Sequence, residues 1–278
     1  MKSLKKLMIC LFFSIFTIIS LFIIFWFPYF PSFPNFFNSN LFYKSLNCTL
    51  GFDHIYVINL EYRTDRHEKI EVIANQLNLN FEYFPAVSKF NRKELEKFNS
   101  GKLLNSQKAG YISHYKVYQS IIANGYDNAL ILEDDVDIEM NIVNIMTDIL
   151  PDLPIGWDLL YLGHCGWEIN GEYVGSSNEH KIYKSNEPGC THAYAVSSLG
   201  ANKLLNKLEL ENPQDPIDLE IIEKIQQGII ISYSFQPQVI VQWRSIDNPS
   251  DVSPGSNIGS YPLKNSTLHY LGFSWNYE

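Results

Sequence analysis

Four acidic side chains follow one short hydrophobic segment, and their spacing indicates metal chemistry. Residues 129–132 are apolar, and Glu133, Asp134, Asp135 and Asp137 come directly after them. Carboxylates this close repel one another unless a cation neutralises them. Hard oxygen ligands at a strand end suit Mg²⁺ or Mn²⁺ that shares its coordination with phosphate oxygens. A solvated acidic turn is the alternative, because Asp is common in turns.

The hydrophobic pattern predicts a fold that could position this cluster. Apolar runs alternate along the chain with segments of helical spacing. The expected strands are residues 54–60, 81–87, 129–132, 159–162, 193–196, 229–232 and 239–242, and the expected helices are 65–77, 107–123, 199–208 and 217–227. This order predicts an α/β domain built on a mostly parallel sheet, in which ligands lie beyond the carboxyl ends of the strands.

The charge balance limits the possible partners. The 278 residues include 21 Lys and Arg against 30 Asp and Glu, which gives a net charge of −9. An acidic surface repels polyanions, so nucleic acid is not an expected partner. A nucleoside diphosphate would need a metal cation or a few local Lys and Arg residues to offset the charge.

An uncharged apolar run near the N-terminus predicts a membrane anchor. Residues 7–27 contain no charge and are long enough to span a bilayer. Lys2, Lys5 and Lys6 precede the run, which predicts a cytosolic N-terminus and a lumenal remainder. A cleaved signal peptide is the alternative, but the run exceeds a signal h-region and no Ala occurs before Ala74 to form a cleavage site.

This pattern predicts a single-pass type II membrane protein of the Golgi or endoplasmic reticulum, with its folded domain in the lumen. The expected organisation is a cytosolic N-terminus at 1–6, a transmembrane signal anchor at 7–27, a stem at 28–51 and a lumenal domain at 52–278.

Cysteines and glycosylation motifs agree with a lumenal domain. Asn47-Cys48-Thr49 and Asn265-Ser266-Thr267 are N-glycosylation sequons. Outside the apolar run three cysteines remain, Cys48, Cys165 and Cys190. At most one intrachain disulfide can therefore form, with one thiol left over. No Cys-x-x-Cys or Cys/His spacing suggests zinc.

A series of motifs resembles glycosyltransferase family 25, which includes bacterial lipopolysaccharide and collagen galactosyltransferases. The motifs are YVINL at 56–60, RTDR at 63–66, Ser113-His114, ILEDDVD at 131–137, DLLYLG at 158–163, THAYAV at 191–196, Pro216-Ile217-Asp218 and Ser250-Asp251-Val252. The similarity covers roughly residues 55–252, and an ordered set of motifs is more specific than any single one.

The resemblance implies an A-type nucleotide-diphospho-sugar transferase fold, an inverting reaction and a metal bound through the acidic motif. It makes Asn59, Arg63, Arg66, Ser113 and His114 candidate donor-binding residues. Structural alternatives stay open: Asn59 could cap a turn, the arginines could be exposed helix charges, and His114 could be a hydrogen-bonded core histidine.

Sugar transfer requires a stabilised leaving group, so the acidic residues are given specific roles. Glu133, Asp135 and Asp137 are candidate ligands of Mn²⁺ (or Mg²⁺), which stabilises a departing diphosphate as a Lewis acid. Asp134 is expected to face ribose or sugar hydroxyls. Side-chain alternation does not decide which acids contact the metal, because the strand ends at this point.

Transfer also requires a base for the acceptor hydroxyl. Asp218 is the candidate general base, because inverting transferases of the resembled fold carry their base in this half of the chain. Asp215 and Glu220 are neighbours that could take its place. Asp218 also stands at a predicted helix start, so helix capping is its structural alternative.

The expected function is a metal-dependent inverting glycosyltransferase. It would move a sugar, galactose or glucose, from a UDP-linked donor to a hydroxyl of a glycan or protein acceptor. One alternative is a catalytically inactive, membrane-tethered carbohydrate-binding protein with the same fold. A metal-dependent phosphodiesterase would usually add several metal-binding histidines, and the seven in this sequence do not cluster.

Overall fold

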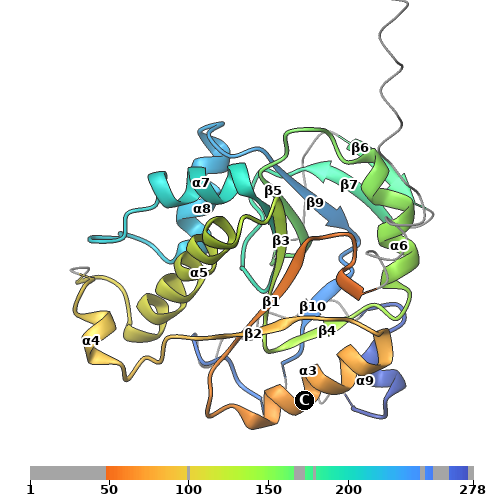
Figure 1. Cartoon of the computed structure of the whole chain (residues 1–278), viewed down its shortest axis with the longest axis horizontal. Helices are drawn as coiled ribbons and strands as arrows, with labels where there is room; N and C mark the ends of the chain where they lie inside the picture. Colours follow the sequence, from red (N-terminus) through yellow and green to blue (C-terminus); the bar gives the residue numbers. More distant parts are fainter. Residues whose placement is uncertain are drawn as a thin grey trace, which may run out of the picture. The chain divides into compact units, whose positions relative to one another are not determined.

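The computed structural model describes residues 48–98, 101–165, 173–177, 180–244, 248–252 and 263–274 (Figure 1). The predicted cytosolic segment at 1–6, the anchor at 7–27 and most of the stem at 28–51 lie outside these ranges. Within them, no helix has both the length and the apolar character needed to cross a membrane. The core begins close to the predicted domain start, because Leu50 and Phe52 are both buried in it.

A mixed sheet of eight strands forms the centre of the folded domain, in the order β2-β1-β3-β8-β5-β9-β7-β6. The strands are β1 (His54–Asn59), β2 (Glu82–Pro85), β3 (Asn128–Glu133), β5 (Leu159–Gly163), β6 (Tyr173–Ser177), β7 (His180–Lys184), β8 (Ala193–Ser197) and β9 (Ser232–Gln236). β1 pairs in parallel with β2 and β3, and β5 pairs in parallel with β9, whereas the pairings of β7 and β8 are antiparallel. All strands except β7 and β8 therefore run in one direction, which confirms the predicted α/β class with a large, mostly parallel sheet.

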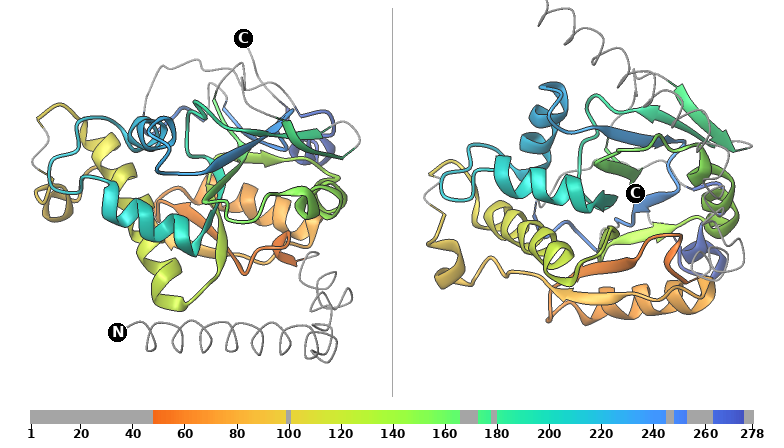
Figure 2. Two further views of the ribbon diagram at one scale, coloured as in Figure 1. Left: turned by 90° about the horizontal axis from the view of Figure 1, so that it is seen from above. Right: turned by 45° about the horizontal axis from the view of Figure 1, so that its top comes forward.

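The two faces of the sheet are covered by different helices (Figure 2). Ile55 and Val57 of β1 pack in one cluster with α3 (Thr64–Leu77), α6 (Ile142–Ile149) and α9 (Thr267–Tyr270). A small antiparallel sheet of β4 (Val136–Ile138) and β10 (Ile240–Gln242) lies on this side. Tyr56 and Ile58 pack in the other cluster with α4 (Arg92–Leu95), α5 (Asn105–Asn124), α7 (Ser198–Lys207) and α8 (Ile217–Gln226). Both faces are buried, which explains why the strands read as continuous apolar runs.

Local signals in the sequence set the ends of these elements. The backbone N–H of Leu104 donates to the Gln107 side chain at 2.9 Å where α5 begins. Gly125 ends α5 with a φ of +69°, a backbone conformation that favours glycine. At the start of α7, the Ser197 hydroxyl accepts from the Gly200 N–H at 3.0 Å, as expected of a serine N-cap.

One predicted strand was misplaced and several elements were not predicted. The apolar residues 229–231 do not form a strand; they follow α8 as a turn in which Ile229 and Ile230 donate to the carbonyl of Lys224. The strand β9 begins only at Ser232. The short elements β4, β6, β7 and α6 were not predicted, because each spans only three to eight residues.

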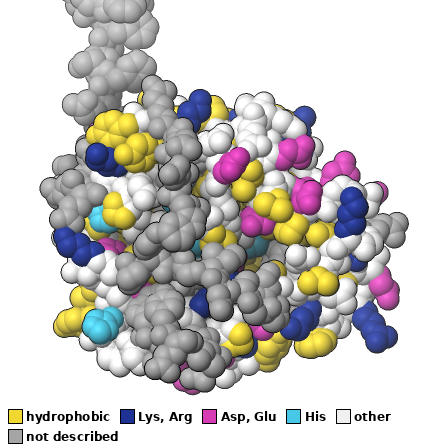
Figure 3. All heavy atoms as spheres, turned by 180° about the vertical axis from the view of Figure 1, so that it is seen from behind, with side chains coloured by type: hydrophobic (Ala, Val, Ile, Leu, Met, Phe, Trp, Pro, Cys, Tyr) yellow, Lys and Arg dark blue, Asp and Glu magenta, His cyan; other side chains and the backbone are white. Residues whose placement is uncertain are grey.

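Charged side chains of both signs lie on the face opposite that of Figure 1. Asp and Glu side chains gather on one side of the view in Figure 3, whereas Lys and Arg side chains are scattered among uncharged ones.

Candidate active site

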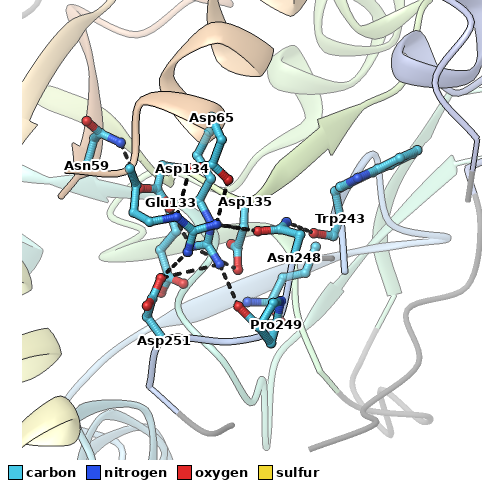
Figure 4. Close-up of polar contacts among 12 residues, drawn as sticks. Asn59, Asp65, Glu133, Asp134, Asp135, Trp243, Asn248, Pro249 and Asp251 are labelled. Atoms are coloured by element: carbon cyan, nitrogen blue, oxygen red, sulfur yellow. Dashed lines mark hydrogen bonds and ion pairs between the residues drawn. The ribbon is translucent and has the colours of Figure 1, made fainter. Parts of the chain in front are cut away.

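The carboxyl ends of β1 and β3 bring together the predicted polar residues. The two strands are parallel neighbours with Ile58 opposite Glu133, so the residues that follow each strand meet at one edge of the sheet. There the Asn59 amide donates to Oδ2 of Asp134 at 2.8 Å (Figure 4). This is the position at which α/β sheets bind ligands.

Arg66 of α3 is the cation of this cluster. Its side chain is 5% exposed, and its Nη1 donates to Oδ1 of Asp134 at 2.7 Å and lies 3.7 Å from Oδ2 of Asp135. The other guanidinium nitrogens donate to Oδ1 of Asn248 at 2.9 Å and to the carbonyl of Pro249 at 3.0 Å. Asp134 therefore has both oxygens bonded to protein, one by Asn59 and one by Arg66.

Arg63 connects the start of α3 to the segment 248–252. It forms a bidentate pair with Asp65, at 2.9 and 2.8 Å, and its Nη2 donates to Oδ1 of Asn248 at 2.6 Å. Its Nη1 also bonds Asp251. The two predicted donor-binding arginines thus hold the 248–252 segment against the acidic residues.

Asp135 has hydrogen-bonding capacity that the protein leaves unused. Its side chain is 5% exposed, and Oδ1 has no hydrogen-bond partner among the described residues. Burial raises the pKa of Asp135, Arg66 opposes this, and Glu133 and Asp134 add to it. Burial likewise raises the pKa of Asp134 against the effects of Arg66 and Asn59. A buried carboxylate with an unpaired oxygen is costly to the protein, so Asp135 fits a bound cation.

Glu133 is held by two side chains from other elements. Thr191, just before β8, donates its hydroxyl to Oε1 at 3.0 Å, and Nε2 of His114 on α5 lies 3.3 Å from the same oxygen. Burial alone would raise the pKa of Glu133, but His114 and Thr191 lower it. The ring of His114 is itself bonded through Nδ1 to the Tyr194 hydroxyl at 2.9 Å. Glu133 is therefore fixed as an anion at the strand end.

A cavity opens beside these carboxylates. Its walls come from the ends of β1 and β3, the first half of α5, the loop after β2 and the 248–252 segment. Its lining includes Tyr62, Lys89, Ser113, His114, Glu133 and Asp134. The hydroxyl of Ser113 is already used within the protein, since it donates to the Ala109 carbonyl at 2.7 Å and accepts from the Val87 N–H at 2.8 Å.

Asp137 has a different role from the other acids. Asp137 is a residue of β4, and its side chain is fully buried. Oδ1 accepts from the N–H groups of Ile138 on the same strand and of Leu268 on α9, at 2.9 and 3.0 Å. Oδ2 accepts from the Ser266 hydroxyl at 2.5 Å. All of these partners belong to the protein, so the contacts attach α9 to β4 and do not mark Asp137 as a ligand.

The same region uses the second sequon. Nδ2 of Asn265, the atom to which a glycan would attach, donates to the buried Glu139 at 2.7 Å. Ser266 and Thr267 are buried, whereas Asn265 is exposed, so the folded domain holds two of the three sequon residues in its structure and leaves the Asn at the surface.

One segment, Cys190-Thr191, links the candidate base to the acidic cluster. Cys190 forms a disulfide with Cys165, and its backbone N–H donates to Oδ2 of Asp218 at 3.2 Å. The next residue, Thr191, bonds Glu133. Cys48 stays free, which agrees with the predicted single pair and leftover thiol.

The two neighbours proposed as alternative bases differ from Asp218. Glu220 is buried and accepts from the Tyr111 hydroxyl at 2.8 Å and from the Gln214 N–H at 3.0 Å. Asp215 is exposed on the loop before α8. Asp218 is half-buried and is the one of the three that bonds the segment leading to Glu133.

Sequence reasoning missed several residues of this site. Thr191, Asn248 and Asp251 all contact predicted residues, but none was assigned a role. Thr191 and Asp251 lie within motifs that carried the family resemblance, so a signal was present. Asn248 had none, because its partner arginines lie more than 180 residues earlier in the chain.

Comparison with known proteins settles the family. A family model described as Glycosyltransferase family 25 (LPS biosynthesis protein) matches residues 52–219. The chain belongs to glycosyltransferase family 25. It is 29% identical over 180 residues to a glycosyltransferase 25 family member of Aedes aegypti, covering 58% of this chain and 29% of that protein. It is 26% identical over 174 residues to procollagen galactosyltransferase 1-B of Xenopus laevis, covering 56% and 28%.

A third relative of the family 25 chain has a different name. The human inactive glycosyltransferase 25 family member 3 is 27% identical over 174 residues, covering 56% of this chain and 29% of that protein. The chain thus spans less than a third of the length of each of these three relatives.

Proposed function

We propose that this family 25 chain is a metal-dependent, inverting glycosyltransferase. It moves galactose or glucose from a UDP-linked sugar donor to a hydroxyl of a glycan or protein acceptor. Galactose as the sugar is supported by similarity to a protein named as a procollagen galactosyltransferase.

The observation that carries the proposal is the unpaired, buried Oδ1 of Asp135, which directly follows Glu133 and Asp134, two carboxylates that line a cavity at the carboxyl ends of β1 and β3. Asp135 and Glu133 are the proposed ligands of Mn²⁺ or Mg²⁺, because hard cations prefer carboxylate oxygens. When bound, the ion acts as a Lewis acid on the departing diphosphate. Two carboxylates leave positions for phosphate oxygens and water, as such ions usually require.

The other acid of the cluster orients the donor. Asp134 lines the cavity and is held rigidly by Asn59 and Arg66, so its position does not depend on the ligand. Arg66 also offsets the charge of the neighbouring carboxylates, which otherwise would repel a diphosphate. A fixed carboxylate beside the cavity suits hydrogen bonds from ribose or sugar hydroxyls.

Asp218 is the proposed general base. It takes the proton of the acceptor hydroxyl as the new C–O bond forms on the face of the sugar opposite the breaking bond to diphosphate. Asp218 lies in the first turn of α8, and a helix N-terminus interacts favourably with negative charge.

The proposed setting is the lumen of the Golgi or endoplasmic reticulum. It rests on the uncharged run at residues 7–27 behind three lysines. Protection of the domain from protease in sealed microsomes tests this topology, and digestion of the intact domain would contradict it.

A second candidate function is carbohydrate binding without catalysis, which similarity to a human protein named as inactive favours. Such a protein would retain sugar binding but would not release nucleoside diphosphate. Full-length protein should be assayed with UDP-galactose and UDP-glucose, with and without Mn²⁺ and with and without a hydroxyl acceptor. Release of UDP that needs Mn²⁺ supports the transferase. A donor that raises the melting temperature with Mn²⁺ but is never cleaved supports the binding protein.

A further inference from the structure

The loop before β8 reaches both proposed catalytic groups. Cys190 donates its backbone N–H to Asp218 at 3.2 Å, and Thr191 donates its hydroxyl to Glu133 at 3.0 Å. Two adjacent residues therefore contact the proposed base and a proposed metal ligand, which come from different elements, α8 and β3.

This loop is fixed from the opposite side by the end of β5. The disulfide joins Cys190 to Cys165, and the Cys165 N–H donates to the Gly189 carbonyl at 2.8 Å. A Cβ added to Gly189 would lie 2.7 Å from the Cys165 carbonyl oxygen, so glycine is needed for this close approach. The two backbones are thus held together at residues 165 and 189–190.

The backbone at Cys190 is also in an unusual conformation. Its φ is +62°, in the left-handed region that residues other than glycine rarely adopt. Such conformations persist when the surroundings determine them, and they gather at functional sites. Here the disulfide and the bond to Asp218 both act on the same residue.

We propose that Cys190 is a positioning residue whose disulfide to Cys165 sets the Cys190 N–H against Asp218 and the Thr191 hydroxyl against Glu133. This inference rests on the proposed function, since it has one disulfide-held segment position both the proposed base, Asp218, and a proposed metal ligand, Glu133. Thr191 acts through Glu133 and is likewise a positioning residue.

The contact of Cys190 with Asp218 and the contact of Thr191 with Glu133 can be tested by separate measurements. The double variant Cys165→Ala/Cys190→Ala removes the tether and should lower kcat by at least about 10-fold at a temperature where it is folded, because misplaced general bases lose efficiency. At saturating Mn²⁺ its KM for the donor should change by less than about threefold, since a group acting in the transition state affects kcat.

The second arm concerns Glu133. Thr191→Val removes the hydroxyl at nearly constant shape and should weaken Mn²⁺ binding in the presence of UDP by about 10-fold, a magnitude typical of lost outer-shell partners. Electron paramagnetic resonance of free Mn²⁺ measures this without turnover. Thr191→Ser, which keeps the hydroxyl, should restore affinity to within about threefold of wild type.

Cys48→Ala is the matched control for removing a cysteine, because Cys48 is a free thiol that contacts neither acid. A disulfide with a purely structural role would lower the melting temperature of the double variant and leave kcat per folded molecule and Mn²⁺ affinity unchanged; that result overturns the inference. If the double variant does not fold, the pair Thr191→Val and Thr191→Ser decides, and equal Mn²⁺ affinities overturn it. A wild-type chain without metal-dependent turnover would fail the proposed function, and this inference with it.

Discussion

The end of β3 and the strand β4 that follows it use their aspartates in opposite ways. Asp135 and Asp137 are two residues apart, both are buried, and burial raises the pKa of both. Yet Asp137 accepts three hydrogen bonds from β4 and the segment of α9, whereas one oxygen of Asp135 has no partner among the described residues. Burial and a raised pKa therefore do not by themselves mark a ligand-binding carboxylate.

What separates the two residues is unmet hydrogen-bonding capacity. A carboxylate whose oxygens are satisfied by the protein contributes to stability, and removing it leaves donors unpaired. A carboxylate with an unpaired buried oxygen costs stability until a ligand arrives. The contrast predicts that changes at the two positions affect different properties of the protein.

The largest expected effect tests whether a third carboxylate, Asp218, belongs with the functional group. Asp218→Asn keeps the shape and an oxygen that can accept from the Cys190 N–H, but it cannot accept a proton, so turnover should fall by about 10² to 10⁴ while donor affinity changes little. Turnover, donor affinity and melting temperature should be measured on the same preparations. Asp215→Asn on the neighbouring exposed loop is the control and should be near wild type.

A purely structural role for Asp218, as the acceptor of the Cys190 N–H, gives the reverse pattern. Stability would fall modestly, by about 1 kcal/mol or less, with nearly normal turnover. Turnover within a few-fold of wild type would exclude Asp218 as the base.

The second prediction concerns Asp135. Asp135→Asn should weaken Mn²⁺-dependent donor binding by at least about 100-fold, since loss of even an outer-shell partner of a metal lowers metal affinity by about 10- to 100-fold. The fold should stay intact, because removing one of several crowded charges relieves repulsion. Calorimetry with UDP and Mn²⁺ measures the affinity. Undiminished affinity in the folded variant would remove Asp135 from the site.

The third prediction completes the contrast at Asp137. Asp137→Ala leaves the Ser266 hydroxyl and the Leu268 N–H without their acceptor, so the free energy of unfolding should fall by about 1 to 3 kcal/mol. UDP and Mn²⁺ affinity per folded molecule should stay near wild type. Urea unfolding and calorimetry on Asp137→Ala and Ser266→Ala check both statements. A stable Asp137→Ala variant that has lost Mn²⁺ binding would show that Asp137 is a ligand after all.

Hydrophobic periodicity was enough to predict most of the sheet and the main helices. β1, β3, β5 and β8 are buried on both faces and read as apolar runs, so the predictions at 54–60, 129–132, 159–162 and 193–196 hold. The run at 229–231 has the same composition but packs as the turn after α8. Only Ile230 of this run is buried and Ile231 is exposed, so an apolar run alone does not identify a strand.

The site was predicted where a cluster was local in sequence and less completely where it was not. The acids at the end of β3 and the residues after β1 were found, because adjacent parallel strands end at one edge. Asp137 was grouped with the acids by spacing, although its partners Ser266 and Leu268 lie about 130 residues later. Asn248 was missed for the same reason. Partners distant in sequence leave no local pattern from which to infer them.

The smallest expected effect is on the pH dependence of stability, and it concerns His164, a histidine that has no proposed role in catalysis. His164 follows β5 and is buried, and burial lowers its pKa from the ordinary 6.5 despite a hydrogen bond from its ring to the Phe235 carbonyl at 3.2 Å. Because the folded pKa is below the unfolded one, the unfolded chain binds more protons in the window just under pH 6.5. The stabilisation from neutral His164 is therefore complete above pH 6.5 and is lost as pH falls through that window.

His164→Gln keeps a side-chain donor without titrating, so its unfolding free energy should decline less than that of wild type between pH 7 and 5. Urea unfolding at several pH values measures the two slopes. Donor binding with Mn²⁺ at pH 7 should be the same in wild type and His164→Gln. Equal slopes would contradict the prediction, because they would mean that His164 is protonated as readily in the folded protein as in the unfolded one.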